Sequence, residues 1–112
     1  MTVFTHLSEY KIMWAWVLFD LPVMTKQQRH QATKFRNYLL DEGFQMSQYS
    51  VYLRLCGNRE KMEALFDRIE RNTPPEGFVK CIGITDKQFE SIRTFHGKTP
   101  KAVKKPEQLS LF

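Results

Sequence analysis

Asp20 is the residue whose type and setting point most clearly to chemistry. It lies near the end of residues 13–21 (MWAWVLFDL), an apolar and aromatic run that is typical of a strand buried on both faces. A carboxylate in such a place costs free energy unless a donor or a cation compensates its lost hydration. Mg²⁺ is often held by one or two carboxylates with water and phosphate oxygens. Asp20 is therefore a candidate Mg²⁺ ligand for phosphodiester hydrolysis, and the alternative is an Asp that caps backbone amides.

The remaining histidines and cysteines form no catalytic or metal-binding pattern. His6, His30 and His96 are scattered, and no two share helical spacing. Cys56 and Cys81 fall in predicted strands, where a thiol behaves as a small hydrophobe. The sequence also lacks a glycine-rich phosphate loop, a Gly-x-Ser-x-Gly elbow and a His-Glu-x-x-His motif. We expect structural or surface roles for these residues, with both thiols reduced.

The charge of the chain indicates a polyanionic partner. The net charge is +5 and the isoelectric point is about 9.4. Four lysines and no acid fall within residues 97–106, which are either a solvated extension or a phosphate-contacting arm. Candidate phosphate contacts also lie on a predicted helix, where the alternative is an ordinary solvated face: Lys26, Arg29, Lys34 and Arg36. Arg54 projects from a predicted strand toward either a dimer partner or a groove.

The elements that must position these residues follow from hydrophobic periodicity and capping signals. Thr25 and Gln28 form a capping box, and Gly43 is a left-handed stop, so a helix is predicted between them. Residues 44–56 are too long for one strand, which predicts two strands with a reversal at 47–50. The other predicted elements are a helix over 59–72 capped by Asn58, a strand over 79–85, a helical turn over 86–89 and a short strand over 92–95.

The order β-α-β-β-α-β predicts a ferredoxin-like α+β fold, an antiparallel sheet with both helices on one face. The other face then needs cover, and a second copy of the chain can supply it. In a two-fold dimer a single Asp20 becomes a pair. The predicted organisation is an N-terminal extension (1–12), the ferredoxin-like domain (13–97) and a basic linker with an apolar tail (98–112). The longest apolar run has seven residues and no secretory signal is present, so we expect a cytoplasmic protein without membrane spans.

An ordered set of segments resembles the small CRISPR-associated endonuclease subunit of the spacer-acquisition machinery. The residues of these segments most resemble the branch found with type II systems. The strand-end Asp, the Gly-Phe turn and the Gln-x-Ser-Val-Tyr strand carry the resemblance, which covers about residues 13–97. The matching residues are WVLFDLP (16–22), Arg29, FRNYLLDEGF (35–44), MSQYSVY (46–52), VKCIGIT (79–85), Gln88 and Ile92.

The resemblance implies a homodimer that bridges two dimers of a larger integrase subunit and binds duplex DNA for insertion into the CRISPR array. It also implies that Asp20 is the Mg²⁺ ligand and nuclease residue, acting on RNA or DNA, and that Ser50 lies beside it. In such complexes the nuclease activity is often dispensable. The alternatives are a stand-alone metal-dependent endoribonuclease of the toxin type and a generic ferredoxin-like nucleic-acid-binding module. This sequence lacks the aromatic strand signature that such a binding module is expected to carry.

The apolar C-terminus predicts a contact with another chain. Leu109, Leu111 and Phe112 end the sequence, and an exposed Leu-x-Leu-Phe segment is unusual without a partner. It would add a strand to the dimer mate or to the larger integrase subunit, and the alternative is an idle tail. The same segment, QLSLF, resembles the short peptide that docks on the bacterial DNA-polymerase sliding clamp.

Overall fold

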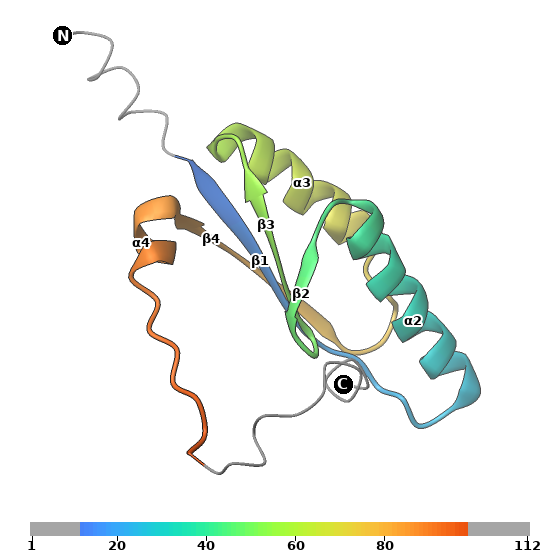
Figure 1. Cartoon of the computed structure of the whole chain (residues 1–112). Coiled ribbons are helices and arrows are strands. Elements are labelled where there is room, and N and C mark those ends of the chain that lie inside the picture. The colour runs from blue at the N-terminus through green and yellow to red at the C-terminus, as the bar shows by residue number, and fades with distance from the viewer. Residues whose placement is uncertain (1–11, 99–112) are drawn as a thin grey trace, which may run out of the picture.

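The computed structural model describes residues 12–98, in which two long helices cover one face of a four-stranded antiparallel sheet (Figure 1). The strands lie in the order β2-β3-β1-β4. This is the predicted ferredoxin-like arrangement. The elements are β1 (Met13–Asp20), α2 (Lys26–Asp41), β2 (Gln45–Gln48), β3 (Val51–Cys56), α3 (Arg59–Arg71), β4 (Phe78–Thr85) and α4 (Asp86–Glu90).

The predicted capping signals define α2. The Thr25 hydroxyl accepts a hydrogen bond from the Gln28 amide at 3.1 Å, and the Gln28 side-chain oxygen accepts one from the Thr25 amide at 3.0 Å. After the helix, Gly43 adopts a φ of +93°, a conformation that glycine reaches without the steric cost of a Cβ. Phe35 and Leu39 are buried against the sheet, as their spacing predicts.

The predicted reversal between β2 and β3 is confirmed, and it lies against the end of β1. The register of the two strands is irregular between Met46 and Gln48, and Ser50 has a φ of +74°. The Phe19 amide donates a hydrogen bond to the Ser50 carbonyl at 3.1 Å. The turn is thereby fixed beside the residue that precedes Asp20.

The core lies between the sheet and the helices. Alternate residues of β1 point into it because successive side chains of a strand face opposite sides. The Asn58 side chain caps α3 by accepting a hydrogen bond from the Lys61 amide at 2.8 Å. Buried residues of β1 and α3 pack together in one cluster: Met13, Ala15, Val17, Phe19, Met62, Leu65 and Ile69.

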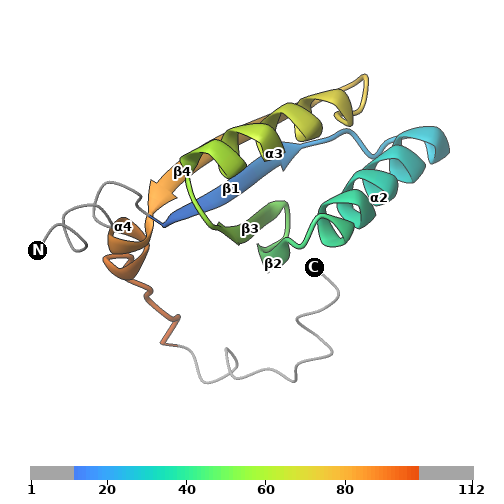
Figure 2. The ribbon, with the colours of Figure 1, turned by 90° about the horizontal axis from the view of Figure 1, so that it is seen from above.

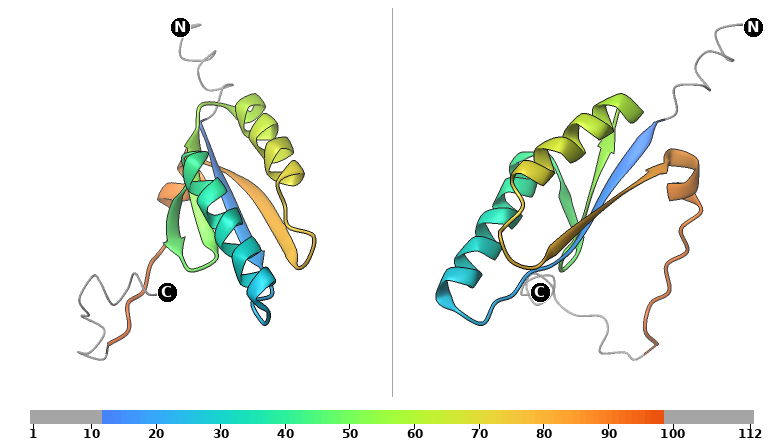
Figure 3. Two further views of the ribbon diagram at one scale, coloured as in Figure 1. Left: turned by 90° about the vertical axis from the view of Figure 1, so that its right-hand side faces the viewer. Right: turned by 180° about the vertical axis from the view of Figure 1, so that it is seen from behind.

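The face of the sheet opposite α2 and α3 is largely apolar, and we call it the open face. Among the helices of residues 12–98, only α4 lies on this side, at one end of β4 (Figures 2 and 3). The ring of Phe89 stacks on Trp14 with centroids 4.0 Å apart, and the Trp14 indole donates to the Asp86 carboxylate at 2.8 Å. The side chains of the open face on the three longer strands belong to Trp14, Trp16, Leu18 and Asp20 of β1, Val51, Leu53 and Leu55 of β3, and Phe78, Lys80, Ile82 and Ile84 of β4.

The prediction of a strand over 92–95 is wrong. The turn over 86–89 is confirmed as α4, but residues 92–97 form no strand. The Ile92 amide bonds the Phe89 carbonyl, so the chain continues out of α4 by a local turn. Phe95 is 80% exposed, and within residues 12–98 no strand pairs with this segment.

Residues 1–11 of the predicted N-terminal extension and most of the predicted tail, with Leu109, Leu111 and Phe112, lie outside the described residues. The division of the chain into extension, domain and tail therefore stays a prediction. Within residues 12–98 no helix is both long and apolar enough to cross a membrane.

Candidate functional site

Asp20 is the last residue of β1, and its side chain is exposed at the edge of the open face. Its register partner on β4 is Phe78, and Lys80 is a diagonal neighbour on the same face. The Lys80 ammonium lies 5.3 Å from the centroid of the Phe78 ring. A carboxylate, an aromatic ring and a cation therefore lie together, and the exposure of Asp20 removes the desolvation cost that the apolar sequence predicts.

The backbone at Asp20 is held from both sides. Opposite the Ser50 turn, Gly77 adopts a φ of +82° and packs against the chain that leaves β1. A Cβ at Gly77 would lie 2.5 Å from the Asp20 carbonyl oxygen and 2.9 Å from Cδ of Pro22, so only glycine fits. Among the described residues no backbone amide bonds the Asp20 carboxylate, which argues against the capping alternative.

Asp20 supplies one carboxylate, which cannot coordinate a metal ion completely by itself. Within residues 12–98, no group of three or more His, Cys, Asp or Glu side chains is placed to hold an ion. This donor set fits Mg²⁺, which accepts one or two carboxylates and takes its other ligands from water and phosphate. It does not fit structural zinc, which needs four protein ligands.

Two of the predicted phosphate contacts lie on the flank of α2 that faces the β2–β3 turn. Arg29 and Arg36 are seven residues apart and therefore lie on one side of the helix. Arg29 donates hydrogen bonds of 3.2 Å to the carbonyls of Val23 and Met24, which holds the loop before α2. The Arg36 guanidinium lies over the Tyr49 ring, 4.4 Å from its centroid. Both arginines therefore also have structural contacts.

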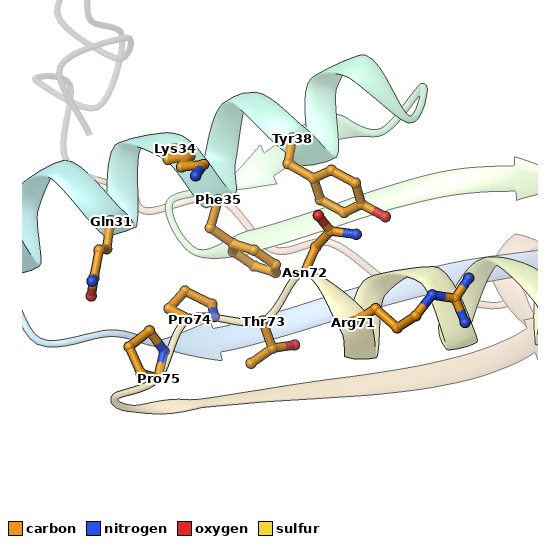
Figure 4. Close-up of a pocket in the computed structure, with 9 residues that line it drawn as sticks. All are labelled: Gln31, Lys34, Phe35, Tyr38, Arg71, Asn72, Thr73, Pro74 and Pro75. Carbon is orange, nitrogen blue, oxygen red and sulfur yellow. The ribbon is translucent and has the colours of Figure 1, made fainter.

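The other two predicted cations of α2 are Lys34 and Lys26. Lys34 lines a cavity of about 270 Å³ between α2 and the end of α3, with Phe35 and Pro74 among the apolar walls (Figure 4). Lys26 is exposed at the first residue of the helix. Lys26 is three residues from Arg29 and therefore neighbours it on the helix, so only Lys34 is separated from the other predicted cations.

A hydrogen-bonded network that the sequence pattern did not predict joins the ends of α2 and α3. The Arg68 guanidinium donates to both oxygens of the Glu42 carboxylate, at 2.9 and 3.1 Å, and the Tyr38 hydroxyl donates to the same group at 2.8 Å. The bond from Arg68 lowers the pKa of Glu42. Burial, followed by the bond to Glu42, raises the pKa of Tyr38 to about 12. These residues stabilise the helix pair.

Arg54 faces a groove on the helix side of the sheet. Its register partner is the buried Ala15, so its side chain leaves β3 on the face that α2 and α3 cover. There it lines a cavity of about 230 Å³ together with Lys61 and Arg68. Neither Lys61 nor Arg68 was predicted as a partner of Arg54, although their seven-residue spacing on α3 places them on one side of the helix.

The thiols are unsuited to nucleophilic catalysis. Cys56 is buried and Cys81 is partly buried. Desolvation raises the pKa of Cys56, and it raises that of Cys81 to about 11, so both stay protonated at neutral pH. His30 and His96 are exposed, in agreement with a surface role. Asp20 remains the candidate for hydrolysis.

The fold and these side chains define a ferredoxin-like α+β protein with an exposed carboxylate at the end of its first strand. The family model described as CRISPR associated protein Cas2 matches residues 13–92. The chain belongs to this family, which confirms the resemblance to CRISPR-associated endonuclease subunits, while the assignment to type II systems stays a prediction.

Curated relatives cover nearly the whole chain. A protein of Paracidovorax avenae named CRISPR-associated endoribonuclease Cas2 is 49% identical over 107 residues, which are 95% of this chain and 99% of the relative. A protein of the same name from Flavobacterium psychrophilum is 44% identical over 110 residues, 97% of this chain and 96% of the relative. A third, from Treponema denticola, is 41% identical over 83 residues, 74% and 82% of the two chains.

Proposed function

We propose that this chain is an endoribonuclease that cleaves phosphodiester bonds with Mg²⁺ at Asp20, and that it works as a homodimer in CRISPR spacer acquisition. The observation that carries the nuclease proposal is the exposed Asp20 carboxylate, held between the Ser50 turn and Gly77. The relatives are named endoribonucleases, which supports RNA as the substrate.

The open face supports a dimer. Several of its apolar side chains remain about half exposed: Leu55 at 51%, Phe78 at 52% and Ile82 at 53%. A second copy that covers this face would bury them, which is favourable in proportion to the apolar area removed from water. Because Asp20 lies on the same face, dimerisation would bring the second carboxylate toward the first.

Asp20 is the residue that would hold the metal ion. Mg²⁺ bound there would supply charge stabilisation for a phosphodiester and a more acidic water molecule. The chain itself orients the carboxylate through its fixed backbone, and Lys80 adds a positive charge next to the position of a phosphate. The second copy, water and substrate oxygens would complete the coordination.

Cleavage of single-stranded RNA by the purified protein tests the nuclease role. We expect cleavage with Mg²⁺, none with a chelator, and a loss of at least about 100-fold for Asp20→Asn, as for removal of a catalytic acid–base or metal-binding group. Asp67→Asn, at an exposed position on α3, is the matched control. Full cleavage by folded Asp20→Asn, or no cleavage by the wild type with Mg²⁺ at any pH tried, would refute the assignment.

The bridging role is a second proposal, supported by the net charge of +5 and by the family. In it the dimer connects two dimers of the larger integrase subunit and binds duplex DNA, with Lys26, Arg29, Lys34 and Arg36 as candidate phosphate contacts and Leu109, Leu111 and Phe112 as the partner-binding tail. This role does not require Asp20.

Co-purification with the integrase encoded beside a CRISPR array tests the bridging role. We expect a complex with the full chain and with Asp20→Asn, and loss of the complex when residues 107–112 are removed. If the protein cleaves RNA but forms no complex with the integrase, the stand-alone toxin-type nuclease is the supported alternative. If it binds nucleic acid but neither cleaves RNA nor forms the complex, the generic binding module is the supported alternative.

A further inference from the structure

The cavity between β3 and α3 gathers positive charge without a matching number of acids. Arg54, Lys61 and Arg68 line it, along with Cys56, Gly57 and Ala64. In the described part of the chain no carboxylate lines it, and the Glu42 carboxylate, which Arg68 contacts, is also bonded by Tyr38. Three cations around one cavity repel one another, so the arrangement is costly unless an anion binds there.

The sequence of α3 separates its charges around the helix. Lys61, Ala64 and Arg68 are spaced by three and four residues, so they form one row along the cavity. The acids of the same helix do not line the cavity: Glu60, Glu63, Asp67 and Glu70. Ala64 has no side chain beyond Cβ, which leaves space between the two cations.

Two glycines let the cations lie along the cavity walls. Nε of Arg54 lies 3.4 Å from the position that a Cβ of Gly43 would take, and Nζ of Lys61 lies 3.4 Å from the corresponding position at Gly57. Among the described residues Arg54 and Lys61 have no side-chain hydrogen bond or ion pair. Arg68 donates hydrogen bonds to Glu42 through Nε and Nη2, so its Nη1 group can bind a ligand.

The position of the cavity adds to its preference for anions. One end of it, at Gly57 and Lys61, lies beside the first turn of α3, whose backbone N–H groups carry partial positive charge, and its other end reaches Arg68 in the last turn. A tetrahedral phosphate is an anion that arginine and lysine donors commonly bind, and it is also favoured beside a helix start. Arg54 pairs with Ala15 near the beginning of β1, whereas Asp20 ends that strand on the other face, so the two sites are separate.

We propose that Arg54, Lys61 and Arg68 form a binding site for one phosphate group. The site goes beyond the proposed function because it does not involve Asp20 or cleavage. The phosphate can come from a nucleic-acid backbone or from a free phosphate, and the chemistry of recognition is the same.

Nuclear magnetic resonance of the full-length protein tests this site. We expect inorganic phosphate to shift the backbone amide signal of Gly57 in a saturable manner, while that of Gly77, beside Asp20, stays unchanged. Sodium chloride at equal ionic strength is the control for screening. A short DNA duplex with 5′-hydroxyl ends, which offers only backbone phosphates, is the second ligand.

Variants then tie the signal to the cavity. Arg54→Gln and Ala64→Glu should each raise the dissociation constant about tenfold or more, through loss of a charged donor or gain of a blocking carboxylate. Lys87→Gln on α4 and Thr94→Glu, at an exposed position after α4, make the matching charge changes elsewhere and should have little effect.

The outcomes separate the sources of the phosphate. A Gly57 shift with the duplex alone assigns the site to a nucleic-acid backbone, and a shift with phosphate alone assigns it to a small phosphate ligand. No Gly57 shift with either, a shift equal to that with chloride, or equal binding by folded Arg54→Gln and Ala64→Glu would overturn the proposal.

Discussion

At the scale of single residues, Asp20 and Glu42 are carboxylates with different roles because their surroundings differ. Asp20 is exposed at a strand end, where it can meet a substrate. Glu42 is bonded by Arg68 and Tyr38 and stabilises the contact between α2 and α3. Position in the strand made Asp20 predictable from the sequence. Glu42 and Arg68 are 26 residues apart, so only the fold brings them together.

The Glu42 network should make the free energy of unfolding depend on pH in the acidic range. Because the pKa of Glu42 lies below its ordinary value of 4.5 in the folded protein, its contribution is present above that value and is lost as the pH falls through the lowered pKa. We expect Glu42→Gln to reduce the free energy of unfolding by about 1–3 kcal/mol at pH 7. This difference should shrink as the pH falls below 4.5.

Urea denaturation of the wild type and Glu42→Gln at neutral and acidic pH measures this difference. Glu63→Gln, at an exposed position of α3, removes a carboxylate outside the network and is the control. An undiminished difference at low pH would mean that the network does not depend on the charge of Glu42.

At the scale of elements, local signals gave the helices and turns correctly. The capping box of Thr25 and Gln28, the Asn58 cap and the reversal before β3 depend on residues a few positions apart, and all are confirmed. The predicted strand over 92–95 failed because strand formation needs a paired neighbour, which the local pattern does not reveal. The cavity around Arg54 combines a strand and a helix, and the pattern of either element alone does not reveal it.

The turn before β4 should control the position of Asp20. Gly77→Ala places a methyl group against the Asp20 carbonyl at a φ of +82°, so the backbone at the end of β1 must move. We expect a loss of about 1–3 kcal/mol in the free energy of unfolding, as for a strained backbone position. We also expect weaker RNA cleavage although Asp20 itself is intact.

Thermal denaturation and the RNA cleavage assay together check this expectation. Gly97→Ala is the control, because among the described residues no heavy atom lies within 4 Å of the position that its added methyl group would take. Unchanged stability and cleavage in Gly77→Ala would show that the turn does not constrain the site.

At the scale of the whole molecule, the sheet has a helix-covered face and an open face, and these carry different groups. The helix side carries the cavity of Arg54, Lys61 and Arg68, and the open face carries Asp20 among apolar side chains. A dimer formed through the open face would leave the cationic cavity accessible on the outer side of each copy.

A charge on the open face should prevent dimerisation. Ile82 pairs with Trp16 on the central strand, so Ile82→Glu would place a carboxylate inside the proposed interface. We expect a monomer by light scattering coupled to size-exclusion chromatography, together with reduced RNA cleavage. Leu40→Glu, at an exposed position of α2, should remain dimeric. A dimer of unchanged affinity in Ile82→Glu would exclude this face as the interface.

Both tryptophans of the chain, Trp14 and Trp16, lie on the open face. Indole fluorescence shifts to shorter wavelength when water is removed from around the ring, so this protein contains its own optical reporter for that face. We expect the emission maximum to move to the blue as protein concentration rises through the association range, and to stay constant in Ile82→Glu. The assembly of two copies can thus be followed in real time without any attached dye.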